Sequence, residues 1–134
     1  IASGVHRHRE SVNTACEVID IASSLDPNTV KVVRDHQKKA LYFSRSRIPW
    51  VSSEEQQSVS IRFLKHIGIY GYSLGVLKGF VASKTCLEEQ SERLEQLRFL
   101  HFGVPVIVHD AVDVCGIGID TLEDYNKACA GLDK

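Results

Sequence analysis

The stretch VKVVRDHQKKALYFSRSRIPW, residues 30–50, decides the fold because it places two apolar runs on either side of a short polar segment. VKVVRD (30–35) is typical of a buried strand, and HQKK (36–39) is typical of a hairpin loop. ALYFSRSRIPW (40–50) indicates a second strand, which Pro49 ends. The pattern therefore predicts a β-hairpin-like insertion over about residues 30–72.

The segments around this hairpin alternate between strand-like and helix-like patterns. We expect further strands at 12–19, 66–72 and 105–110, and helices at 74–82, at 87–102 and after Asp120. The helix at 87–102 is the clearest, because leucines recur at helical spacing, acidic residues crowd its first turns and Gly103 suits its end. Strands that alternate with helices predict an α/β fold.

The composition is that of an ordinary globular domain. The 134 residues carry a net charge of −1, and no basic run favours nucleic acid as a partner. No apolar stretch reaches the length of a membrane span. The four cysteines are scattered without a C-x-x-C pair, which favours free thiols in a reducing cytoplasm. Since the chain begins with Ile1 and has no methionine, we expect it to be part of a longer protein.

Two polar clusters lie in predicted strands. Arg45 and Arg47 follow an apolar run, where a planar guanidinium suits a carboxylate or a phosphate. The residues alone favour the alternative, in which both side chains extend into solvent. His66 and Tyr70 are four residues apart, and therefore lie on one face of the strand at 66–72. They could line a sugar-binding wall or serve as a core histidine and a packing tyrosine.

Two further clusters lie in or near predicted helices. Glu95 and Gln96 belong to the helix at 87–102, where polar residues face solvent by default. Asp120 precedes the last helix, and could cap it or offer a hard carboxylate oxygen to Mg²⁺. His6 and His8 form an H-x-H pair with no third ligand nearby, which is insufficient for a metal site.

Five blocks of the sequence together resemble a known family. They are DPNTVKVVRD (26–35), ALYFSRSRIPW (40–50), KHIGIYGY (65–72), ERLEQLRFLHFG (92–103) and GIGIDTLEDY (116–125). In this order they are similar to the CMP-Kdo synthetases, the 3-deoxy-manno-octulosonate (Kdo) cytidylyltransferases. The pairing of LEQLR with GIDTxED is specific, whereas no single block would be.

The resemblance implies a Rossmann-like nucleotidyltransferase fold. This chain would be its carboxyl-terminal part, with the hairpin as a dimerisation insertion. It also implies a cytoplasmic homodimer in which a Kdo hydroxyl attacks the α-phosphate of CTP. Pyrophosphate leaves and CMP-Kdo forms for lipopolysaccharide synthesis, with Mg²⁺ as the cofactor.

Six residues match site residues of the family. The resemblance assigns Arg45 to the sugar acid, His66 and Tyr70 to sugar binding, Glu95 and Gln96 to sugar hydroxyls, and Asp120 to Mg²⁺. Arg45 and Asp120 are accordingly the expected catalytic residues.

The chain also departs from the family pattern. Ser73 stands where the family commonly has arginine, so a salt bridge or a substrate contact is expected to be missing. Neither the family's ARxxSTRLPGKPL-like phosphate loop nor its VQGDEP-like block occurs in these residues, so we expect the CTP-binding part to be absent and the chain to be inactive alone. A non-catalytic binding or dimerisation module and a related acid-sugar cytidylyltransferase remain the alternatives.

Overall fold

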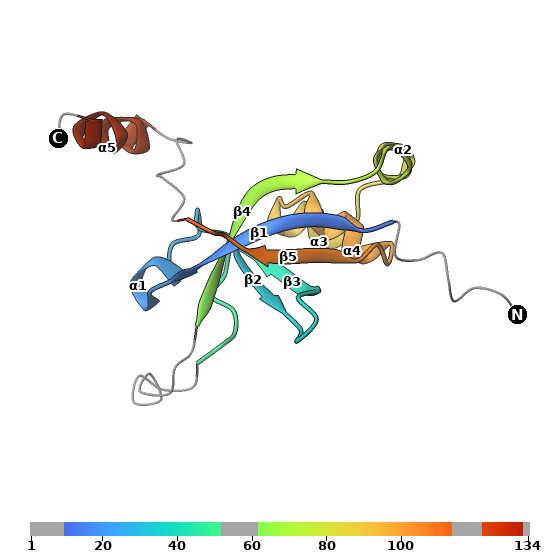
Figure 1. Cartoon of the computed structure of the whole chain (residues 1–134), viewed down its shortest axis with the longest axis horizontal. Coiled ribbons are helices and arrows are strands. Elements are labelled where there is room, and N and C mark those ends of the chain that lie inside the picture. Colours follow the sequence, from blue (N-terminus) through green and yellow to red (C-terminus); the bar gives the residue numbers. More distant parts are fainter. Residues whose placement is uncertain (1–9, 52–61, 114–121, 133–134) are drawn as a thin grey trace, which may run out of the picture.

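Five strands form one mixed sheet in the computed structural model, which describes residues 10–51, 62–113 and 122–132. The strands are β1 (Val12–Ile19), β2 (Lys31–Arg34), β3 (Ala40–Ser44), β4 (Phe63–Gly71) and β5 (Val106–Asp110), in the order β3-β2-β4-β1-β5. β1 and β5 are parallel, and the other neighbours are antiparallel. The predicted α/β class and the hairpin of β2 and β3 are confirmed (Figure 1).

The helices are short. They are α1 (Ile21–Ser24), α2 (Leu74–Ala82), α3 (Leu87–Glu92), α4 (Gln96–His101) and α5 (Leu122–Leu132). None of the helices in the described ranges is long and apolar enough to cross a membrane. Figure 1 shows α3 and α4 lying together on one side of the sheet, behind β1 and β5.

The core lies between this helical layer and one face of the sheet. Alternate residues of β1 supply Val12, Thr14 and Cys16, all buried, as the period of a half-buried strand requires. Leu97 and Phe99 of α4 belong to the same buried cluster. The helices therefore cover the inward-facing side chains of the central strands.

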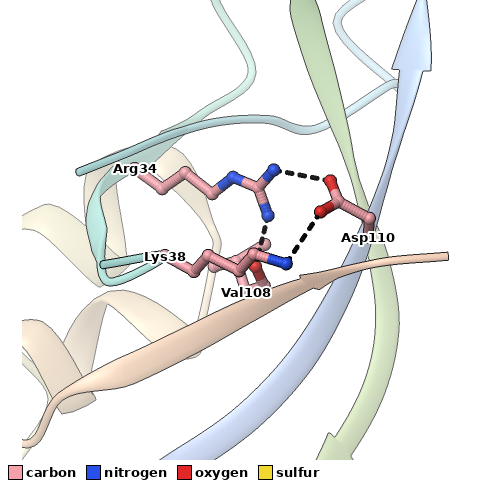
Figure 2. A network of polar contacts seen from close by, with 4 residues as sticks. All are labelled: Arg34, Lys38, Val108 and Asp110. Atoms are coloured by element: carbon pink, nitrogen blue, oxygen red, sulfur yellow. Dashed lines mark hydrogen bonds and ion pairs between the residues drawn. The ribbon is translucent and has the colours of Figure 1, made fainter. Parts of the chain in front are cut away.

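The sheet curls until the hairpin from one edge reaches the strand at the other edge. The carbonyl of Lys38, at the tip of the hairpin, accepts a hydrogen bond from the backbone N–H of Val108 in β5 at 2.8 Å. Figure 2 shows the side chains that accompany this contact: Arg34 and Lys38 both bind the Asp110 carboxylate, at 2.5 and 3.0 Å. Hydrogen bonds from Lys38 and Arg34 hold the pKa of Asp110 below its usual value.

The prediction of a single helix at 87–102 is wrong. The segment contains two six-residue helices, α3 and α4, and Arg93 between them has left-handed backbone with φ of 54°. The turn places Leu94 in the core, with 5% of its surface exposed. Burial of Leu94 outweighs the helical propensity of the segment, because short helices have little stability of their own.

Contacts with Glu92 explain why β3 ends early. The Glu92 carboxylate accepts a hydrogen bond from the Ser44 hydroxyl at 2.6 Å and another from the backbone N–H of Arg45 at 2.9 Å. Because that N–H is used by Glu92, it does not continue the sheet ladder. The strand therefore ends at Ser44, and the predicted extension to Pro49 is wrong.

Most other boundaries agree with the predicted ones. β1, α2 and β5 are confirmed to within one residue, whereas β4 begins three residues before the predicted start. α1 was not predicted; the Asp20 side chain caps it by accepting from the Ser23 N–H at 2.7 Å. Cys16, Cys86 and Cys129 are free thiols, and Cys115 lies outside the described residues.

The end of α4 has the predicted glycine stop. Gly103 adopts φ of 74°, its N–H binds the Leu100 carbonyl at 3.0 Å, and the Val104 N–H binds the Phe99 carbonyl at 2.8 Å. These two bonds are those of a Schellman motif, which needs left-handed backbone at the glycine.

Replacing Gly103 by alanine is expected to lower the free energy of unfolding by about 1 kcal/mol, because a Cβ is strained in left-handed backbone. Gly79, within α2, is the matched control, since a Cβ there meets no atom within 4 Å. Gly79→Ala should raise the free energy of unfolding by about 0.5–1 kcal/mol. Urea unfolding of both variants checks this, and a neutral Gly103→Ala would contradict the motif.

Candidate functional site

His66 lies in β4 and is buried against the core, with 9% of its surface exposed. Its Nε2 is 2.9 Å from Oγ1 of Thr14, and the Thr14 hydroxyl donates to the Ile67 carbonyl at 3.0 Å. A hydroxyl has a single proton, so Thr14 Oγ1 accepts from an Nε2–H of His66. Nδ1 of the neutral ring is then the unprotonated nitrogen, which can accept a hydrogen bond.

The neutral state of this ring follows from its surroundings. Burial lowers the pKa of His66 from 6.5 to about 4. Phe43 packs edge-on against the ring with centroids 5.0 Å apart, and the Tyr70 ring lies 5.4 Å away. The prediction that His66 and Tyr70 share one face of a strand is confirmed.

A small cavity of about 90 Å³ lies beside Tyr70. Its lining consists of Tyr70, Tyr72, Leu77, Phe80, Glu95 and Phe99. Burial raises the pKa of Tyr70, and the nearby Glu95 carboxylate raises it further, so the phenol stays protonated and can donate a hydrogen bond. The structure thus brings His66, Tyr70 and Glu95 into one continuous group.

Glu95 and Gln96 are adjacent but have different environments. Glu95 occupies the N-cap position of α4, is exposed, and makes no capping hydrogen bond with its side chain. Gln96 is the first residue of α4 and only 4% exposed. The expectation that polar helix residues face solvent is therefore confirmed for Glu95 and wrong for Gln96.

Arg45 is held apart from this group by backbone oxygens. Its Nε donates to the Glu92 carbonyl at 2.9 Å, and one terminal nitrogen donates to the Pro27 carbonyl at 3.1 Å. These contacts connect Arg45 to α3 and to the turn before β2, rather than to His66 or Tyr70. Two of its three guanidinium nitrogens are thereby oriented by the fold.

Asp120 and Ser73 are two further positions that the sequence singled out. Asp120 lies outside the described residues, and α5 begins two residues after it. Ser73 caps α2, because its Oγ accepts a hydrogen bond from the Val76 N–H at 3.3 Å. Ser73 thus has a structural role in this chain.

A larger cavity of about 410 Å³ adjoins the first one. It is bordered by Glu10, Gly75, Val76, Gly79, Phe80, Ser83, Arg98, Phe99, Phe102 and Val104. Arg98 does not make it a site for anions, because Glu89 binds this guanidinium, with Oε2 at 2.7 Å from Nε. The guanidinium carbon also lies 4.1 Å from the centroid of the Phe80 ring. Phe80 and Phe99 border both cavities.

Sequence reasoning missed two residues that position the site. Thr14 fixes the tautomer of His66, and its place among the buried alternate residues of β1 was the available signal. Glu92 orients Arg45 across 47 positions of sequence, for which no local signal exists. Together the site offers a neutral imidazole acceptor, a phenol donor and one carboxylate, which suit the hydroxyl groups of a polar ligand.

The comparisons with known proteins agree with this fold. The cytidylyltransferase family model matches residues 4–106. The chain is 42% identical over 121 residues to a 3-deoxy-manno-octulosonate cytidylyltransferase of Erwinia tasmaniensis, covering 88% of this chain and 49% of that protein. It is 42% identical over 133 residues to the one of Thioalkalivibrio sulfidiphilus, covering 95% and 53%. The chain therefore spans about half the length of these curated relatives.

A solved structure has a similar fold. It is a CMP:2-keto-3-deoxy-manno-octonic acid synthetase complexed with CTP, 38% identical, with a TM-score of 0.81 over 92% of this chain and 49% of that one. The match to the family model extends over residues 4–106 of 134, and this structure shares the arrangement of the sheet and helices. The chain belongs to the cytidylyltransferase family.

Proposed function

We propose that this chain supplies the sugar-binding half of an enzyme that transfers a cytidylyl group from CTP to Kdo. A Kdo hydroxyl oxygen forms a bond to the α-phosphorus of CTP and loses its proton, while the bond to pyrophosphate breaks, giving CMP-Kdo. The observation that carries the proposal is the 38% identity and TM-score of 0.81 to a synthetase of this name complexed with CTP.

The site geometry supports a role in sugar binding. Nδ1 of neutral His66 accepts from a sugar hydroxyl, the Tyr70 phenol donates to a sugar oxygen, and the Glu95 carboxylate accepts from a second hydroxyl. Gln96, the buried first residue of α4, is the proposed partner of Glu95 in binding the sugar hydroxyls. The Arg45 guanidinium, which the Glu92 and Pro27 carbonyls orient, binds the sugar carboxylate through its other terminal nitrogen.

We propose Asp120 as the residue of this chain that holds Mg²⁺. A carboxylate oxygen is the ligand type that this hard cation prefers. The ion would supply charge neutralisation on the phosphates. Asp120 lies in the GIGIDTLEDY block that resembles the family, two residues before α5.

We also propose that the working enzyme is a homodimer. Leu41 in β3 and Ile69 in β4 expose 62% and 69% of their surfaces, and Trp50 exposes 78%. Exposed apolar side chains of this size favour burial against a partner. A second copy of the chain, packed on the hairpin region, is the partner we propose.

One prediction is that this chain needs the amino-terminal half of the enzyme for activity. The 134-residue chain with CTP, Kdo and Mg²⁺ should release no pyrophosphate above background, because no block among its residues resembles the family's phosphate loop. Adding the amino-terminal half of the Erwinia tasmaniensis relative, fused or as a second chain, should restore release. A coupled assay measures pyrophosphate release by the chain alone and by the complemented enzyme. Turnover by the chain alone would contradict the proposal that it supplies only the sugar-binding half.

The same complemented enzyme tests the sugar-binding group. Tyr70→Phe removes the proposed donor, and should raise KM for Kdo by about 10-fold while leaving KM for CTP unchanged, since a lost hydrogen bond in a buried site costs about 1–1.5 kcal/mol. Tyr125→Phe in α5, an exposed position, is the matched control. Equal KM values for Kdo in both variants would remove Tyr70 from the site.

A further prediction follows from the low pKa of His66. Between pH 6.5 and about 4 the unfolded chain binds a proton on this ring that the folded chain does not. The contribution to stability is therefore complete above about pH 6.5 and is lost as the pH falls towards 4, by about 3 kcal/mol in all. Urea unfolding at several pH values should show this loss.

His66→Gln is the informative variant, because glutamine retains a donor for Thr14 but does not titrate. Its free energy of unfolding should depend less on pH across this window than that of the parent. His109→Gln, at an exposed histidine, should keep the parental dependence. If the His66→Gln slope equals the parental slope, His66 is not the buried titrating group.

Another prediction distinguishes a metal ligand from a helix cap at Asp120. Asparagine caps helices nearly as well as aspartate, so Asp120→Asn should change the free energy of unfolding by less than about 1 kcal/mol. As a Mg²⁺ ligand the amide loses the negative charge, and activity of the complemented enzyme should fall by about 10²-fold. Normal activity with unchanged Mg²⁺ dependence would contradict the metal assignment.

A further inference from the structure

Three potential metal ligands converge where α3 begins and α4 ends. Cys86 directly precedes α3, Glu88 lies in its first turn, and His101 is the last residue of α4. One ligand atom from each lies within 4.8 Å of the other two. None of the three belongs to the group of residues assigned above to Kdo or to Mg²⁺.

The spacing is close to that of a bound transition-metal ion. For Zn²⁺ with bonds of about 2.0–2.3 Å, tetrahedral ligand atoms lie about 3.3–3.8 Å apart. Oε2 of Glu88 is already 3.2 Å from Nδ1 of His101. The ligand atoms lie within 4.8 Å of one another, so the thiol sulfur needs to approach its partners by at most about 1.3 Å.

The Glu88 carboxylate provides an independent sign of a missing ligand. Its Oε2 is shielded from solvent and makes no well-formed hydrogen bond, although Nδ1 of His101 lies 3.2 Å away. Its own backbone N–H and polar contacts with Cys86 and His101 lower the pKa of Glu88, so the carboxylate is held in its charged form between the other two side chains. A buried polar atom without a partner is costly, and such atoms are rare in folded proteins. A cation among the three residues would remove this cost.

The chemistry of the three ligands selects the ion. A thiolate and a carboxylate supply two negative charges and imidazole is neutral, so the set balances a divalent cation. Sulfur and nitrogen ligands favour Zn²⁺ over Mg²⁺ or Ca²⁺. The side chains of Glu88 and His101 are each 45% exposed, which gives the ion a path from solvent and leaves a fourth position for water.

We propose that Cys86, Glu88 and His101 form a Zn²⁺ site that joins the start of α3 to the end of α4. The bound ion links two helices of only six residues each. It stabilises the helical layer that carries Glu95 and Gln96. The site is separate from the proposed cytidylyl transfer, and does not depend on it.

The test uses the purified 134-residue chain, freed of metal with a chelator and titrated with Co²⁺ under reducing conditions. Co²⁺ in such a site should give the intense visible bands of tetrahedral coordination and a thiolate-to-metal charge-transfer band in the near ultraviolet. Zn²⁺ should displace Co²⁺ with loss of both. The melting temperature should rise with Zn²⁺ concentration, because the folded state alone holds the site.

Variants assign the site to residues. Cys86→Ser should abolish the charge-transfer band, and His101→Gln, at an exposed position, should weaken Co²⁺ binding at least about 10-fold, since loss of an outer-shell partner alone costs 10- to 100-fold. Cys129→Ser, which removes an exposed thiol on α5, is the matched control and should bind normally. Circular dichroism checks that each variant is folded.

Two outcomes would overturn the proposal. One is the absence of a thiolate charge-transfer band in the parent chain, or its persistence in Cys86→Ser. The other is loss of Co²⁺ binding when both His6 and His8 are replaced by alanine, which would assign the metal to the H-x-H pair.

Discussion

The carboxylate of Glu92 is the contact on which the arrangement of this chain depends. It binds the Ser44 hydroxyl and the Arg45 amide, and so joins the helical layer to the edge of the hairpin. The same residue ends α3, and its carbonyl orients the Arg45 guanidinium. Because the chain then turns at Arg93, Glu95 begins a new helix beside Tyr70 instead of continuing along α3.

The curled sheet provides a second constraint. Asp110 binds Arg34 and Lys38 of the hairpin, so the two edges of the sheet stay in contact. Exposed ion pairs contribute little individually, but here a backbone hydrogen bond from Val108 to Lys38 accompanies them. β4 lies between β2 and β1 in this sheet, and His66 is both buried and within hydrogen-bond distance of Thr14 on β1.

Family membership and individual features are separate properties of this chain. The order of strands and helices is shared with a synthetase structure over 92% of the chain. Ser73 caps α2 through its side chain, which is a local feature of this sequence. The Cys86–Glu88–His101 group lies at the ends of two short helices, outside the sheet.

The sequence by itself determined the local elements: the hairpin, β1, α2, β5 and the glycine stop at Gly103, because alternation, capping and turn chemistry act between residues near each other in the chain. It also indicated that His66 and Tyr70 share a face, since a strand has a period of two. The break between α3 and α4, the early end of β3 and the burial of Gln96 were decided only by the tertiary structure. The early end of β3 depends on Glu92, 48 residues from Ser44, and the other two depend on burial against the core. Such tertiary contacts outweigh the weak propensity of a single turn.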